Sequence, residues 1–253
     1  MIEVTEAQLL AWITPLLWPF LRTLAMFSSL PVLGTRTVPT RVRIALAALV
    51  AVAAQASLPT MPVVPLDSPA AFALVAQQVV IGLSIGFAVR VVFAAIEFAG
   101  EFVGLQMGLN FAGYFDPVTA SAGTATGRFY GTMIAFLFVV INGHLVVLAA
   151  LLQSFTAFPA GPEPFGFLRQ TLPHQWGAEI FSTGLWIALP MIAMLLFTNL
   201  VLGMISRVAS QINIFAIGFP ITLGVGLVGI LLTLPLMQAP FMVAMDRLLS
   251  GFR

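Results

Sequence analysis

The sequence is poor in charged residues and contains no cysteine. Only 8% of its 253 residues are charged, whereas a soluble domain normally carries about 25%. All ten cations are arginine and they face nine acids, so the chain has no basic surface of the kind that binds nucleic acid. The absence of cysteine excludes disulfides and thiolate metal sites. Together these features exclude an ordinary soluble enzyme, a nucleic-acid binder and a disordered chain.

Motifs for catalysis and cofactor binding are also missing. The sequence has no His-Glu-x-x-His motif, no Gly-x-Ser-x-Gly elbow and no phosphate-binding loop. The two histidines, His144 and His174, lie on different predicted elements, and no residues at ligand spacing accompany them. For His144 we favour a structural hydrogen bond over a role as ligand or proton relay. We therefore expect a protein that is not an enzyme, with no catalytic residue, metal site or cofactor.

Long apolar runs dominate what the sequence does contain. Hydrophobic residues make up 60% of the chain, and the mean hydropathy is +1.07. A transmembrane helix needs about 20 mostly apolar residues. Six segments meet this requirement, at residues 9–33, 42–64, 69–108, 129–155, 178–205 and 214–245. Neither strand-like alternation nor heptads are present, so we predict an all-α membrane protein of about six long, kinked helices packed as hairpins.

Charges near the first segments predict the topology. Residues 34–43 contain Arg36, Arg41 and Arg43 and no acid. By the positive-inside rule this basic loop is cytoplasmic, which places the N-terminus on the other side of the membrane. Residues 1–8 carry Glu3 and Glu6 where a signal peptide has a basic region, so we expect no cleaved signal peptide.

The third apolar segment carries charges and regularly spaced glycines. Arg90 and Glu97 share a helix face but lie about 10 Å apart along the axis, so Arg90 needs a partner on another helix or subunit. Gly100 and Gly104 are spaced to let helices approach closely. We predict that Arg90, Glu97, Gly100 and Gly104 form a packing face or subunit seam. The alternative is that the acids only mark the helix end at the membrane interface, and we favour this for Glu101.

A connection longer than usual follows that segment. Residues 106–127 read QMGLNFAGYFDPVTASAGTATG, in which apolar side chains alternate with small ones before a stretch of Ser, Thr, Gly and Ala. Long connections in compact proteins often have a function. The residues alone leave two alternatives open, a functional segment or a re-entrant segment packed against neighbouring helices.

Four blocks of the sequence, taken in order and spacing, resemble the FliR family. This family is the R subunit of the flagellar type III export gate and the homologue of the T subunit of injectisomes. The blocks are PVLGTRTVPTRVRIALA (31–47), IGLSIGFAVRVVFAAIEFAGEFVGLQMGLNFAGYFDP (81–117), INGHLVVLAALLQSF (141–155) and SRVASQINIFAIGFPITLGVGL (206–227). Ala209 and Ser210 depart from the family's proline before Gln-(Ile/Leu)-Asn. Pro220 is followed by Ile221 and Thr222, which resembles the flagellar branch.

The resemblance implies an organisation and a set of partners. Residues 1–177 would resemble a P subunit and residues 178–253 a Q-subunit hairpin, within a helical hetero-oligomeric gate. The implied partners are the P and Q gate subunits, the A and B subunits of the export apparatus, rod-base proteins, membrane lipid and unfolded exported proteins. The implied location is the bacterial inner membrane, in the flagellar basal body.

The resemblance also implies a role for the long connection, which in the family projects into the central pore and helps to plug it. Its aromatic and aliphatic side chains would exclude water, and its small residues would let it move aside for an unfolded chain. The implied function is passage of unfolded flagellar proteins across the inner membrane during flagellum assembly. The plug residues would be Gln106, Met107, Gly108, Leu109, Asn110, Phe111, Tyr114, Phe115, Asp116 and Pro117.

Three alternatives belong to other uses or classes. A virulence-secretion gate subunit would have the same fold. A secondary transporter would have broken helices, and Pro190 and Pro220 could mark them, but the polar cluster expected near the midplane is reduced to Asn199. An intramembrane protease would need a Ser-His pair, an Asp pair or a zinc motif, and the sequence offers none of these.

Overall fold

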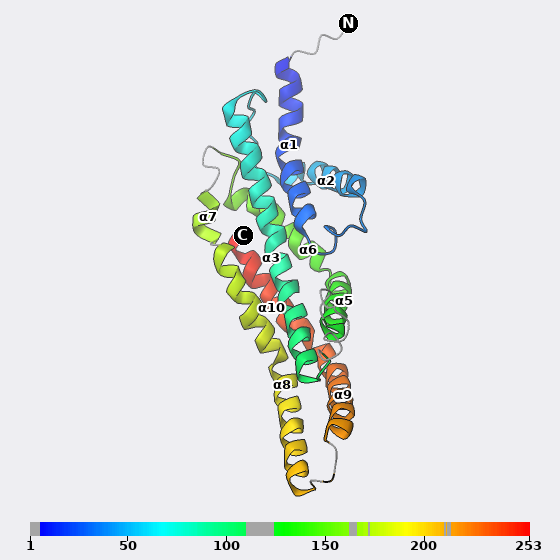
Figure 1. Cartoon of the computed structure of the whole chain (residues 1–253). Coiled ribbons are helices and arrows are strands. Elements are labelled where there is room, and N and C mark those ends of the chain that lie inside the picture. Colours follow the sequence, from blue (N-terminus) through cyan, green and yellow to red (C-terminus); the bar gives the residue numbers. More distant parts are fainter. Residues whose placement is uncertain (1–5, 110–123, 162–165, 172, 210, 212–213) are drawn as a thin grey trace. The chain divides into compact units, whose positions relative to one another are not determined.

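The computed structural model describes residues 6–109, 124–161, 166–171, 173–209, 211 and 214–253. Within these residues the chain is helical and has no strand, which confirms the predicted all-α class (Figure 1). The elements in chain order are α1 Glu6–Ser29, α2 Thr40–Ala54, η1 Gln55–Ser57, α3 Pro69–Gln106, α5 Ala125–Val140, α6 Gly143–Ala157, α7 Gly166–Thr171, η3 Pro173–Gln175, α8 Trp176–Val208, α9 Ile214–Thr233, η4 Leu234–Met237, α10 Gln238–Leu249 and η5 Ser250–Phe252.

The helices follow the predicted apolar segments, but two of these segments are broken. The segment predicted at 129–155 forms α5 and α6, which are bent by 70° at the residues between them. The segment predicted at 214–245 forms α9 and α10, separated by the short helix η4. Pro235 lies at the start of η4, where its missing N–H and its ring end the α-helical hydrogen bonding of α9.

Four helical segments in the described part of the chain are long and apolar enough to cross a membrane, and the bent α5–α6 pair would make a fifth. The predicted number of six is therefore approximate, and α1, which contains Pro15 and Pro19, is not among the four. At about 1.5 Å per residue, the 38 residues of α3 extend about 57 Å, well beyond the hydrocarbon core of about 30 Å. The four segments are Thr40–Ser57, Pro69–Gln106, Trp176–Val208 and Ala216–Phe252.

The helices divide into two compact units. The first comprises Met1–Arg90, Phe138–Trp176 and Met245–Arg253, and the second comprises Val91–Leu137 and Gly177–Ala244. Each unit takes residues from both sides of position 177. The predicted division into residues 1–177 and 178–253 is therefore a different partition from this one, and it stays a prediction.

The first unit has its core where α1 packs against α2 and α3. Trp18 of α1 is fully buried, packs with Ala71 and Leu74 of α3, and donates a hydrogen bond to the carbonyl of Pro62 at 3.1 Å. Gly82 of α3 faces the backbone of α1, where an added Cβ would collide with the carbonyl oxygen of Arg22. The glycine spacing of α3 thus brings two helix backbones into contact within this unit.

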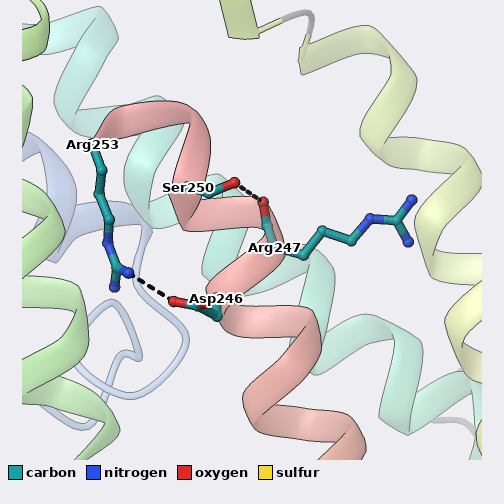
Figure 2. A network of polar contacts seen from close by, with 4 residues as sticks. All are labelled: Asp246, Arg247, Ser250 and Arg253. Atoms are coloured by element: carbon teal, nitrogen blue, oxygen red, sulfur yellow. Dashed lines mark hydrogen bonds and ion pairs between the residues drawn. The ribbon is translucent and has the colours of Figure 1, made fainter.

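The C-terminal residues close the first unit. The guanidinium of Arg253 donates to the carboxylate of Asp246 at 2.7 Å, and the hydroxyl of Ser250 donates to the carbonyl of Arg247 at 2.6 Å (Figure 2). The ion pair is partly exposed, so it contributes little to stability. Burial of Phe252 among aromatic rings of the same unit holds this end of the chain in place.

The second unit is built around the C-terminal half of α3. The ring of Phe98 lies 5.1 Å from Phe181 of α8, and the ring of Phe93 lies 5.9 Å from Phe241 of α10. Edge-to-face pairs of this kind fix the helices laterally. The face of α3 that the other helices cover is completed by Ile96, Ala99 and Val103, all fully buried or nearly so.

Candidate functional site

The candidate site is the connection between α3 and α5 in the second unit. Of its predicted plug residues, Gln106, Met107, Gly108 and Leu109 are described. The others, which are Asn110, Phe111, Tyr114, Phe115, Asp116 and Pro117, lie outside the described residues. The structure therefore describes this site at the two ends of the connection, where it leaves α3 and where it enters α5.

The first end is a helix stop that the sequence encodes. Gly108 has a φ of 78°, a left-handed conformation that glycine adopts without strain. The N–H of Leu109 donates to the carbonyl of Gly104 at 3.0 Å, and the N–H of Gly108 donates to that of Leu105 at 3.1 Å. This pair of bonds is a Schellman motif, which ends α3 and turns the chain in a defined direction.

Met107 anchors this end to the second unit. Its side chain is fully buried and fills the space beside Gly226 of α9, where an added Cβ would lie 2.5 Å from the methionine Cγ. A flexible thioether side chain suits such an irregular gap. The connection therefore leaves α3 from a fixed point.

The second end is the N-terminus of α5. Thr124 precedes the helix, and its hydroxyl accepts a hydrogen bond from the N–H of Gly127 at 3.0 Å, as an N-cap residue does. The N–H of Thr124 in turn donates to the carboxylate of Glu101 on α3 at 2.9 Å. Because Glu101 lies one turn and a half before the end of α3, the two ends of the connection are tied to each other.

The glycines predicted to form a packing face lie against α5 of the same chain. An added Cβ on Gly100 would lie 2.8 Å from the ring of Tyr130, and one on Gly104 would collide with the hydroxyl of Thr126. Both glycines are buried, so the close approach of helices that they allow is between α3 and α5 of this chain. A prediction of a subunit seam therefore rests on the other two residues of that face.

Those two residues, Arg90 and Glu97, are exposed. Glu97 lies over Gly131 of α5, where an added Cβ would be 2.8 Å from its carboxylate oxygen. Arg90 projects from the surface of its own unit, where another chain could reach it. For these two residues the seam stays a prediction.

A hollow of about 680 Å³ opens beside the start of the connection. It lies between the end of α3, α8 and α9, and its walls are mostly apolar with a few polar groups. Its lining includes Gln106, Gly108, Asn199, Phe219 and Thr222. The polar side chains of this lining are those of Gln106, Asn199 and Thr222.

One arginine of the predicted basic loop makes hydrogen bonds with the backbone of that loop. Arg43 of the basic loop donates to the carbonyls of Thr35 and Val38 at 3.2 and 3.0 Å, while Arg36 and Arg41 are exposed. The cytoplasmic location of this loop stays a prediction. Among the residues that the structure describes, no group of three or more His, Asp or Glu side chains could hold a metal ion.

Two charged residues have roles that the sequence reasoning did not identify. Glu101 was expected only to mark a membrane interface, yet it is half-buried and bonded to the N-terminus of α5. Arg22, which lies inside the first predicted apolar segment, is fully buried and makes four hydrogen bonds. No local sequence pattern connects Glu101 with Thr124, because the two residues belong to different elements.

Comparison with known proteins decides the family. The chain matches the family "Bacterial export proteins, family 1" over residues 13–248. It belongs to this family. The flagellar biosynthetic protein FliR of Escherichia coli (strain K12) is 42% identical over 95% of this chain and 92% of its own length. FliR of Pectobacterium carotovorum is 39% identical over the same shares, and FliR of Bacillus subtilis is 29% identical over 83% and 82%. The resemblance found in the four sequence blocks is thus confirmed over nearly the whole chain.

Proposed function

We propose that this chain is a membrane-embedded subunit of the flagellar type III protein export apparatus. The observation that carries this proposal is its similarity, over 95% of its length, to proteins named flagellar biosynthetic protein FliR. The apolar helices support it, because four or five of them can cross a membrane. The chain acts as a core pore subunit that passes unfolded flagellar proteins across the inner membrane.

Its partners in this proposal are the other membrane subunits of the gate. These are the P and Q gate subunits, and the proposal also includes the A and B subunits of the export apparatus, rod-base proteins and the unfolded proteins that are exported. Large exposed apolar surfaces support such an assembly. In an apolar stretch of 18 residues within α8, only 17% is buried inside the chain. An apolar helix face of this size has to meet lipid or another subunit.

The connection between α3 and α5 is the pore plug of this proposal. This proposal is supported by the way both ends of the connection are held. Met107 is buried at the first end, and the N–H of Thr124 donates a hydrogen bond to the carboxylate of Glu101 at the second. The apolar side chains Leu109, Phe111, Tyr114 and Phe115 then exclude water from a narrow pore.

Replacing residues 109–115 with a Gly-Ser segment of equal length tests the plug. We expect the assembled gate to leak ions, because no large apolar side chain then seals the pore. The measurement is membrane conductance in cells with arrested export, at matched amounts of complex. The control replaces residues 118–123 of the same connection in the same way and should leave the membrane tight. A tight membrane in the first variant would contradict the plug.

A further inference from the structure

The basic loop at residues 34–43 carries positive charge that the first unit does not neutralise. Residues 7–66 contain no Asp or Glu, so the loop and the helices on either side of it supply no acid. The side chains of Arg36 and Arg41 are exposed, and neither makes a hydrogen bond or ion pair within the described residues. Both guanidinium groups are therefore available to a partner outside the chain.

The third arginine of the loop has a different task. The guanidinium of Arg43 donates to the carbonyls of Thr35 and Val38 at 3.2 and 3.0 Å, which holds the backbone of the loop against the start of α2. Its Nε atom is buried and has no hydrogen-bond partner among the described residues. A buried donor without an acceptor is unfavourable, so the loop also contains one donor that the described chain leaves unsatisfied.

The start of α2 adds to this positive potential. Its N-cap is Pro39, which makes no side-chain cap hydrogen bond, and its first turn contains no acid. The first N–H groups of a helix have no carbonyl partner within the helix, and the helix dipole makes this end positive. Arg41 and Arg43 are repelled by that dipole, and an anion beside them would be attracted by all of these groups together.

Apolar side chains of α2 lie next to the arginines. Val42, Ile44, Leu49 and Val52 are between 44% and 65% exposed. The segment Thr40–Ser57 can cross a membrane, and only 17% of it is buried inside the chain. The surface therefore presents guanidinium groups directly beside side chains that suit hydrocarbon. A phosphate ion in solution would use only the guanidinium groups, whereas an anionic phospholipid uses both.

We propose that Arg36 and Arg41 bind the phosphate of an anionic phospholipid whose acyl chains lie along the exposed side of α2. Arg43 is a positioning residue for this site, because it holds the loop that carries Arg36. Guanidinium groups suit the role, since they donate paired hydrogen bonds to phosphate oxygens. The inference rests on the membrane fold and does not depend on the proposed export function.

Quenching of a fluorescent label in the loop tests the site, with the 253-residue chain reconstituted in phosphatidylcholine vesicles. The chain has no cysteine, so the exposed Thr37→Cys provides a single thiol for the label. The quenchers are phosphatidylglycerol and phosphatidylcholine that carry a spin label near the head group. An arginine beside an anionic lipid contributes about a fivefold preference, so we expect at least fivefold stronger quenching by phosphatidylglycerol. Equal quenching by both lipids would overturn the proposal.

Variants that remove charge assign the preference to the two exposed arginines. Arg36→Gln and Arg41→Gln should each lower the preference about fivefold, and the double variant should abolish it. The matched control is Arg207→Gln, which removes an exposed arginine from the last turn of α8 and should leave quenching at residue 37 unchanged. A double variant that keeps the preference of the unsubstituted loop would contradict the assignment.

Competition with inorganic phosphate separates a lipid site from a site for phosphate ions. The ion lacks contacts with the apolar side chains of α2, so it should displace the spin-labelled phosphatidylglycerol no better than sodium chloride of equal ionic strength. Stronger displacement by phosphate would show that the loop binds the free ion and would refute the lipid. The double variant Arg36→Lys with Arg41→Lys keeps both charges and should retain a preference that the glutamine double variant loses. Loss of the preference in both would contradict an electrostatic site.

Discussion

At the scale of single residues, Arg22 shows how this chain uses a buried charge. Its guanidinium donates to the side chain of Gln78 at 2.7 Å, to both oxygens of Ser154 at 2.8 and 2.9 Å, and to the carbonyl of Phe158 at 2.9 Å. It also lies 3.7 Å from the ring centre of Phe155. Two of its acceptors are carbonyls at the C-terminal end of α6, where a cation is favoured by the helix dipole.

Replacing Arg22 with alanine should destabilise the first unit strongly. The change leaves several buried acceptors without a donor, and breaking such a network costs about 3 kcal/mol or more. In a domain of this size, that should lower the Tm of the detergent-purified protein by about 6 to 12 °C. The control is Arg36→Ala in the exposed loop, which should leave Tm unchanged. Equal melting of both variants would contradict the role of Arg22.

The sequence could not predict this network. Arg22 and its acceptors Ser154 and Phe158 are separated by more than 130 residues, so no local pattern connects them. The same limit applies to Glu101 and Thr124, which lie on different helices. What the sequence did indicate was that a charge within an apolar segment must face protein or water, and Arg22 obeys that rule.

At the scale of elements, the breaks within apolar segments are the main feature that sequence reasoning missed. The sequence predicted one helix over 129–155, but the chain turns at Asn142, which has a φ of 57°. The Asn-Gly pair at this position is a known turn signal, and the apolar residues around it concealed it. Gly143 completes the turn, because an added Cβ would lie 2.6 Å from the ring of Phe138.

Substitutions at Asn142 should separate backbone conformation from side-chain chemistry. Its side chain makes no capping hydrogen bond to α6, so Asn142→Gly should be tolerated. Asn142→Val should cost about 1 to 2 kcal/mol, because a β-branched residue is strained in the left-handed region. Thermal melting in detergent measures the difference, with the exposed Val140→Ala as control. Equal stability of the valine and glycine variants would contradict the assigned turn.

At the scale of the whole molecule, the sequence predicted both the fold class and the family. Long apolar runs without strand-like alternation predicted an all-α membrane protein, and four sequence blocks predicted its family. Both are confirmed because they depend on properties spread along the chain. The plug and the subunit seam depend on chains and residues beyond the described structure, so they stay predictions.

Arg90 tests whether the exposed face of α3 meets another subunit. Arg90→Ala should lower the amount of assembled gate severalfold while leaving membrane insertion unchanged. The reason is that a charge on the other subunit, buried at the interface, would lose Arg90 as its partner. Arg90→Lys keeps the charge and should assemble better than the alanine variant. Size-exclusion chromatography of mild-detergent extracts measures complex and free chain together. Normal amounts of complex in Arg90→Ala would refute the seam.

The most direct test of the central claim is purification of a C-terminally tagged chain, in mild detergent, from cells that are building flagella. Mass spectrometry then identifies the proteins that accompany it. The export-gate account predicts one large complex that contains the P and Q subunits of the flagellar gate. Recovery of the chain alone, or only as a homodimer, from cells that contain assembled basal bodies would contradict it.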